Sequence, residues 1–191
     1  GTIGVLAESR LTESQRAQAV AVRELVENQM ATLTDIIDLA RLEDGRLRIQ
    51  DEGFDLVELV EGLVETLAGQ AAAKGIDLVA GVPAGVPSAL RGDPKRLRQV
   101  LAILAGNAVK FTDRGGVRLT VEAAPLGAGR PAGSFARLAF IVDDTGPGVP
   151  EEARGRIFEE FGHADVSDAA RFDGAGLGLA VVRRLARAMG G

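Results

Sequence analysis

The chain has 191 residues, 46% of them hydrophobic, which is enough for one good core or for a small domain with a helical appendage. A net charge of −5 and the absence of Tyr and Trp argue against nucleic acid as a partner. There is no Cys, which excludes disulfides and zinc–cysteine sites, and the single histidine, His163, excludes a multi-histidine metal site. No apolar run approaches the roughly 20 residues that cross a bilayer, so we expect no direct membrane contact from this chain and a cytoplasmic location.

The first predicted helix runs to about Leu42, with Thr12 or Ser14 as its N-cap. A mostly apolar stripe recurs along it in steps of three and four, as in a heptad seam, at Ala19, Val22, Val26, Gln29, Leu33, Ile36 and Ala40, and Met30 and Ile37 widen it. So long a seam favours burial against a second copy in a homodimer, and packing on the chain's own domain is the alternative. Asp44 and Gly45 end the helix, so we expect a domain boundary there, between residues 1–44 and 45–191.

Helix and strand signals interleave through the rest of the chain. Three further helices are predicted: from Leu56 to just before Gly75, from Pro94 to about Thr112, and from Leu179 to Met189. The strands are predicted at 46–54, 76–82, 88–92, 117–121 and 135–142. Some of these strands are joined by hairpin-length turns, so we expect an α+β fold, with a mixed sheet covered on one face by helices.

The middle helix, RQVLAILAGNAVKFT, is predicted to serve the core and a site at once. Its apolar arc comprises Leu97, Val100, Leu101, Leu104, Ala108 and Phe111. Ile103, Asn107 and Lys110 form a second stripe beside that arc. An amide oxygen suits a hard cation such as Mg²⁺ and an ammonium group suits phosphate oxygens, although the polar edge of a core helix would show the same pattern.

Two glycine-rich segments follow. Asp144-Thr145-Gly146-Pro147-Gly148 places a carboxylate at a strand end, before glycines that let the backbone approach a flat ligand. A carboxylate only accepts hydrogen bonds, so it would select the amine of adenine, while an ordinary tight turn is the alternative. Gly174-Ala175-Gly176-Leu177-Gly178 opens onto the last helix, whose N-terminal amide hydrogens suit phosphate. It is neither a P-loop nor a dinucleotide fingerprint.

Taken together, these segments form a recognisable series. GDPKRLRQVL with GNAVKFT, then VDDTGPGV, RIFEEF and DGAGLGLAVVRRLARAMGG, resemble the N, G1, F and G2 boxes of sensor histidine kinases of two-component systems. SRLTESQ and the helix to LARLEDGRLRI resemble the second half of their dimerisation and histidine-phosphotransfer hairpin. The resemblance covers nearly the whole chain. It implies the Bergerat ATP-binding fold, a two-layer α/β sandwich, with an N-terminal helical dimerisation hairpin.

The resemblance also implies ATP and Mg²⁺ as cofactors. Asn107 would coordinate Mg²⁺, Lys110 and Arg171 would contact phosphates, and Asp144 would bind the adenine amine. The other nucleotide contacts would come from the glycine segments, with Gly146 and Gly148 at the base and Gly174, Gly176, Leu177 and Gly178 at the phosphates. The terminal phosphoryl group would pass to a histidine and then to an aspartate of a response-regulator receiver domain. A second copy of the chain would pair through the N-terminal helices.

The departures from the family pattern concern activity. Ile103 stands where the kinases usually have Asn and related ATPases have a Glu that activates water, so a gyrase-like hydrolase is disfavoured. The changes at Ala170, Asp173 and Ala175 would weaken nucleotide affinity or slow transfer. The acceptor histidine is expected upstream of Gly1, since His163 lies on the predicted flap, and the strands that normally follow the last helix are expected to be missing. The alternative function is a degenerate kinase-like scaffold that binds a receiver or partner kinase without phosphotransfer.

Overall fold

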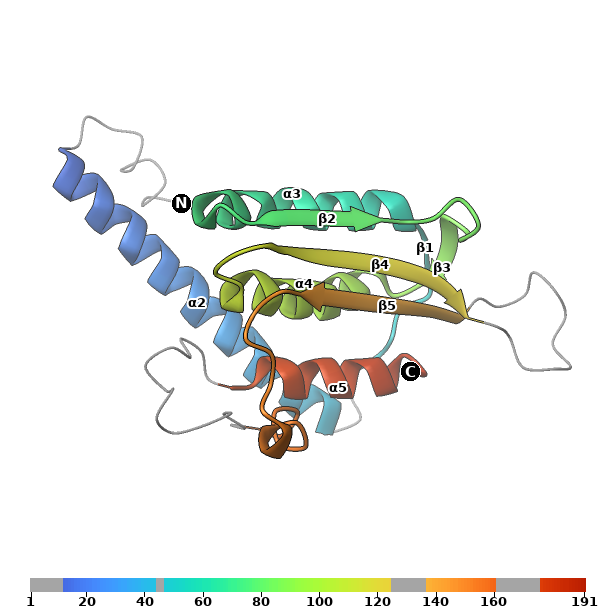
Figure 1. The fold of residues 1–191 in the computed structure, drawn as a ribbon. Coiled ribbons are helices and arrows are strands. Elements are labelled where there is room, and N and C mark those ends of the chain that lie inside the picture. Colours follow the sequence, from blue (N-terminus) through green and yellow to red (C-terminus); the bar gives the residue numbers. More distant parts are fainter. Residues whose placement is uncertain (1–11, 44–46, 125–136, 161–175) are drawn as a thin grey trace, which may run out of the picture.

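The computed structural model describes residues 12–43, 47–124, 137–160 and 176–191 (Figure 1). Its elements, in chain order, are α2 (Glu13–Glu43), β1 (Glu52–Asp55), α3 (Leu56–Lys74), β2 (Asp77–Gly81), β3 (Ala89–Gly92), α4 (Pro94–Phe111), β4 (Gly116–Ala124), β5 (Arg137–Asp144), the 3₁₀ helix η1 (Glu151–Ala153) and α5 (Gly178–Ala188). The strand predicted at 46–54 is reduced to β1. The pairing of β1 with β3 ends at Glu52 opposite Gly92, because the next residue, Asp93, already caps α4.

Helix α2 begins with a reciprocal cap between Thr12 and Gln15. Thr12 Oγ1 accepts a hydrogen bond from Gln15 N at 3.3 Å, and Gln15 Oε1 accepts one from Thr12 N at 3.0 Å, so Thr12 is the N-cap. Near its C-terminal end α2 lies beside α5 (Figure 1). The stripe residues Val22, Val26, Met30, Leu33, Ile36 and Ile37 are 46% to 59% exposed, and Leu25, outside the stripe, is 60% exposed. None of the described helices has the length and apolar content of a membrane span.

Helix α3 has a capping residue at each end. Asp55 Oδ1 accepts hydrogen bonds from Val57 N at 2.7 Å and Glu58 N at 3.1 Å. At the other end, Gly75 takes a left-handed conformation (φ 66°), which satisfies carbonyls of the last turn. The buried face keeps the predicted spacing of three and four residues, with Leu56, Leu59, Val60, Leu63, Leu67 and Ala71.

The main sheet has three strands in the order β2-β4-β5, and β1 and β3 form a separate antiparallel pair. β2 runs parallel to β4, with Leu78 opposite Val117, and β5 runs antiparallel to β4, with Val142 opposite Leu119. Val117, Leu119 and Val121 alternate as predicted and are each at most 2% exposed. The mixed sheet expected from the sequence is therefore confirmed.

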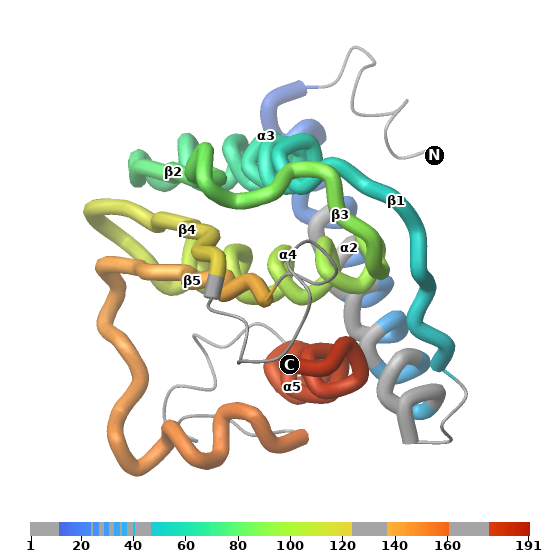
Figure 2. Tube along the Cα trace, turned by 90° about the vertical axis from the view of Figure 1, so that its right-hand side faces the viewer, coloured from blue at the N-terminus to red at the C-terminus, as the bar shows by residue number. Residues whose placement is uncertain are grey.

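The molecule has a sheet layer and a helix layer (Figure 2). α3 and α4 cover one face of the sheet, and the core between the layers includes Leu63, Leu101 and Val121. α5 packs on α4 through a second cluster, formed by Val100, Leu177, Val181, Val182 and Leu185. This arrangement confirms the predicted α+β fold of two layers, and α4 lies between the main core and α5.

Candidate nucleotide-binding site

Helix α4 is fixed at its start, and this determines where Asn107 and Lys110 lie. Asp93, only 6% exposed, caps α4 through Oδ1, which accepts a hydrogen bond from Arg96 N at 2.9 Å, and its Oδ2 accepts one from Gln50 N at 2.9 Å. The face towards the core buries Val100, Leu101, Ala105, Ala108 and Val109. Asn107 and Lys110 are half-buried beside that face, on the second stripe predicted from the sequence. Lys110 Nζ lies 5.4 Å from the centre of the Phe111 ring.

Asp144 is the last residue of β5, and its side chain organises the turn that follows. Its Oδ1 accepts a hydrogen bond from Gly146 N at 2.8 Å. Because a carboxylate has about four lone-pair sites, this bond leaves acceptor capacity for an amine. A Cβ at Gly146 would lie 2.7 Å from Asp144 Oδ1 and 3.0 Å from the carbonyl oxygen of Phe111, so only glycine allows the turn to sit against the end of α4. Gly148 has φ 71°, in the left-handed region.

Thr145 joins this turn to the one that links α4 to β4, a role that the sequence interpretation missed. Thr145 Oγ1 donates a hydrogen bond to Arg114 O at 2.8 Å and accepts one from Gly116 N at 3.0 Å. A Cβ at Gly115 would lie 2.3 Å from Thr145 Oγ1, and Gly115 has φ 92°. The only signals in the sequence were the Thr145 hydroxyl in one glycine turn and the Gly115-Gly116 pair in another. No local pattern connects these two turns.

The second glycine segment is described only from Gly176 onward. Gly176 has φ 66°, and Gly178 opens α5. Leu177 is 3% exposed and belongs to the cluster between α4 and α5, so only its main chain is available to a ligand. Arg171 and Gly174 lie outside the described residues, as does the flap predicted at 163–173.

Both glycine segments meet the same stretch of α4. A Cβ at Gly178 would lie 3.0 Å from Ile103 Cγ2, and Gly146 lies against the carbonyl of Phe111. These two points are eight residues apart, about 12 Å along the helix axis, and Asn107 is midway between them. Ile103, Asn107 and Phe111 are spaced by four, so they lie along one flank of α4. The structure therefore places the Asp144 turn at the C-terminal end of α4 and the start of α5 beside Ile103, and Asn107 lies between these two contacts along the helix.

The same contacts define the environment of Ile103. Its side chain packs against the cluster of α5 that contains Leu177 and Val181. An apolar side chain there has a packing partner and no means of orienting water.

Few of the described side chains could coordinate a metal ion together. Among the described residues, no three His, Cys, Asp or Glu side chains gather in a group that could enclose an ion. Mg²⁺ usually keeps several waters and takes one or two protein ligands together with phosphate oxygens. The half-buried amide of Asn107 fits that kind of site.

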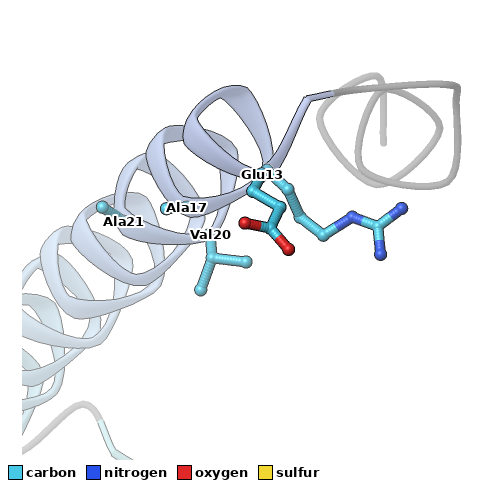
Figure 3. A pocket seen from close by; sticks show the side chains of 5 residues that line it. Glu13, Ala17, Val20 and Ala21 are labelled. Carbon is cyan, nitrogen blue, oxygen red and sulfur yellow. The ribbon is translucent and has the colours of Figure 1, made fainter.

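A hollow on the described surface lies far from these residues. It is lined by Glu13, Arg16, Ala17, Val20 and Ala21, all on the first turns of α2 (Figure 3). One face of a single helix cannot enclose a nucleotide. We therefore assign no ligand to this hollow.

Comparison with known proteins agrees with this geometry. The family described as histidine kinase-, DNA gyrase B- and HSP90-like ATPase matches residues 92–191, which contain α4, the Asp144 turn and α5. The chain belongs to this family. Its matched part is the ATP-binding catalytic domain of a histidine kinase, with the fold shared by gyrase, Hsp90 and the kinases.

Relatives match along nearly the whole chain. The sensory/regulatory protein RpfC of Xanthomonas campestris is 37% identical over 100% of this chain and 26% of its own length. The signal transduction histidine-protein kinase BarA of Escherichia coli is 33% identical over 96% of this chain and 20% of its own length. The chain thus spans about a fifth to a quarter of these relatives. The crystal structure of full-length ShkA in complex with AMPPNP superposes with a TM-score of 0.73 at 38% identity, covering 99% of this chain and 37% of that one.

Proposed function

We propose that this chain binds Mg-ATP for transfer of the terminal phosphoryl group to a histidine upstream of Gly1, and from there to a response-regulator aspartate. The observation that carries the proposal is that Gly146 contacts the last carbonyl of α4, at Phe111, and Gly178 contacts Ile103, each four residues from Asn107 along the helix. ShkA, 38% identical, was crystallised with AMPPNP, an adenine nucleotide, which supports the same ligand class here. Use of ATP also fits the cytoplasmic location expected from the sequence.

Asp144 would recognise the base. Its carboxylate is exposed at the end of β5, with Oδ1 turned towards Gly146 N. The exocyclic amine of adenine would donate to this carboxylate, whereas guanine presents a carbonyl at the corresponding position, which a carboxylate repels. Gly146 and Gly148 would line the base pocket, where their lack of side chains leaves the ring edge room.

The phosphates would lie further along α4. Asn107 would hold Mg²⁺ through its amide oxygen, and the ion would neutralise phosphate charge. Lys110 and Arg171 would contact phosphate oxygens, and the main chain from Gly174 to Gly178, with Leu177 contributing only its backbone, would cradle them at the start of α5. In the transfer itself, the bond from the γ-phosphorus to its bridging oxygen breaks, that oxygen keeps the electron pair in ADP, and a P–N bond to imidazole forms. This domain positions and neutralises the reactants without a covalent step of its own.

We further propose that residues 1–44 and 45–191 are separate units and that the first pairs with a second copy of the chain. The exposed stripe of α2, of which Val26 and Leu33 are members, supports this assignment, since about half of each side chain meets solvent in the single chain. Removal of such a stripe from water is the usual driving force of helix association.

Titration calorimetry with Mg-ATP tests the nucleotide assignment. The wild-type chain should bind Mg-ATP and prefer it to Mg-GTP, and Asp144→Asn should lose roughly 10- to 100-fold in Mg-ATP affinity, because an amide only partly replaces the charged acceptor. Asp143→Asn is the matched control, because its side chain points to the opposite face of β5. Equal losses in both variants, or no binding by the wild type, would contradict the proposal.

Transfer is tested on the full-length protein with ATP labelled at the γ-phosphate. Acid-labile, base-stable label on the protein, and its passage to a receiver domain, are expected. His163→Ala should keep that label, because this histidine is not the proposed acceptor. Label lost with His163→Ala, or no label on a folded dimer that binds Mg-ATP, would count against the phosphotransfer path.

Ile103 supports a second candidate, a scaffold that binds a receiver or partner kinase without transfer. Its packing against α5 leaves an apolar group on the flank of α4 where the resemblance predicts a polar one. A scaffold predicts receiver binding without any label, and the transfer assay separates the two functions.

A further inference from the structure

Lys74, the last residue of α3, reaches across to the end of α4. Its Nζ donates hydrogen bonds to the carbonyl oxygens of Val109 at 3.0 Å, of Lys110, and of Thr112 at 3.0 Å. An ammonium group has three donors, so these carbonyls use all of them. Asp113 Oδ1 is 3.7 Å from the same nitrogen but is 86% exposed, so this ion pair contributes little.

Two of the bonded carbonyls, those of Val109 and Lys110, belong to the last turn of α4, and the third belongs to Thr112, the residue that follows the helix. The last four carbonyls of a helix have no amide hydrogen within it, and they carry the negative end of its dipole. The C-cap residue Thr112 bonds the Ala108 carbonyl through its own N–H, and a cation from α3, 35 to 38 positions away in sequence, bonds the carbonyls that remain. A third of the Lys74 side chain is exposed, and its bonds to Val109 and Thr112 are partly buried, so they are only partly screened.

The same helix end also contacts the Asp144 turn. The carbonyl of Phe111, which Lys74 does not bind, faces Gly146 at a distance that excludes a Cβ. Thr145 Oγ1 holds Arg114 O and Gly116 N, just beyond α4. The segment from Val109 to Gly116 is thus held both by Lys74 and by residues 144–146, and Lys110 lies within it.

We propose that Lys74 is a positioning residue for nucleotide binding, an inference that rests on the proposed function. Lys74 does not contact the nucleotide. Its ammonium fixes the end of α4, so that Asn107 and Lys110 keep their place relative to the Asp144 turn. One nucleotide can then meet the base end and the phosphate end of the site at the same time.

The test compares Lys74→Met with Lys74→Arg by titration of Mg-ATP and of adenosine. Methionine keeps most of the length and removes the three donors, so Mg-ATP affinity should fall about tenfold. Adenosine would contact only the Asp144 turn, so its affinity should not depend on how the base end and the phosphate end of the site are placed. Its affinity should fall less than about threefold. Lys74→Arg keeps charge and donors and should stay within about threefold of the wild type for both ligands.

Asp55→Ala is the control for a merely structural effect. It removes the N-cap at the other end of α3 and should lower stability, but it leaves the end of α4 untouched and should leave Mg-ATP affinity unchanged. If Lys74→Met does not fold, Lys74→Gln, which keeps a donor group, takes its place. Wild-type binding of Mg-ATP with unchanged affinity in the Lys74 variant, or equal losses for adenosine and Mg-ATP, would overturn this inference alone. Absence of wild-type binding would overturn the proposed function together with it.

Discussion

α2 and α4 both carry an apolar stripe at helical spacing, and they use it in opposite ways. α4 buries Leu101 completely and packs against α3, α5 and the sheet. α2 keeps about half of each stripe side chain exposed, for example at Val26 and Leu33, and contacts α5 near one end. The periodicity is the same in both sequences. The difference lies in the second surface: the described part of the chain supplies one for the stripe of α4, and it leaves about half of the α2 stripe in contact with solvent.

The largest expected effect is a difference in stability between the two helices when a leucine of each stripe is replaced by alanine. Leu101→Ala should lower the free energy of unfolding by roughly 2 to 5 kcal/mol, because it leaves a cavity in a fully buried site. Leu33→Ala, at a position 52% exposed, should cost less than about 0.5 kcal/mol in dilute monomer. The measurement is urea unfolding followed by circular dichroism, since the chain has neither Trp nor Tyr for fluorescence. Equal losses would show that α2 is already covered within the chain.

Next in size is the effect of a charge on the stripe of α2. Val26→Glu should raise the dissociation constant of the dimer by at least about 100-fold, because a lone carboxylate would be buried in the interface. Ala17→Glu is the control, since it lies nine residues earlier, about 180° around the helix. Analytical ultracentrifugation measures both variants. If the two dimerise equally well, the stripe is not the dimer interface.

The close approach of α5 to α4 should show as a coupling energy. Gly178→Ala places a Cβ 3.0 Å from Ile103 Cγ2, which should cost about 1 to 2 kcal/mol. Ile103→Ala removes that γ carbon, so the same glycine substitution should cost almost nothing in its background. A double-mutant cycle from urea unfolding gives the difference. Additive energies would mean that the two helices are further apart than described.

The smallest expected effects concern the helix caps. Asp55→Ala should cost about 1 kcal/mol, because two amide hydrogens of α3 lose their acceptor. Thr12→Ala removes the cap of α2 but should leave the cooperative unfolding of the domain unchanged, reducing only helical content in the monomer. Circular dichroism during urea titration distinguishes the two outcomes. A shifted domain transition with Thr12→Ala would mean that α2 folds as part of the domain.

Much of the site was accessible from the sequence because its signals are local. Asn107 and Lys110 share a stripe by helical periodicity, and Asp144 stands at a strand end before glycines, which is where the structure has them. What they do with a nucleotide stays a prediction. Thr145 and Lys74 could not be found in this way, since each bonds to main-chain atoms that are about 30 or more positions away. Nearly every residue type offers the same main-chain carbonyl and amide, so the sequence does not indicate which of them a distant side chain will bond.

The sequence by itself determined the helices and strands, through caps such as Asp93 and Gly75 and through the alternation of Val117, Leu119 and Val121. These patterns act within a few residues, so they need no knowledge of the fold. Only the tertiary structure decided that Gly146 reaches the end of α4 and Gly178 reaches Ile103, and that the stripe of α2 stays exposed. Such outcomes depend on which surfaces the folded chain brings together, because burial and close approach are properties of pairs of elements.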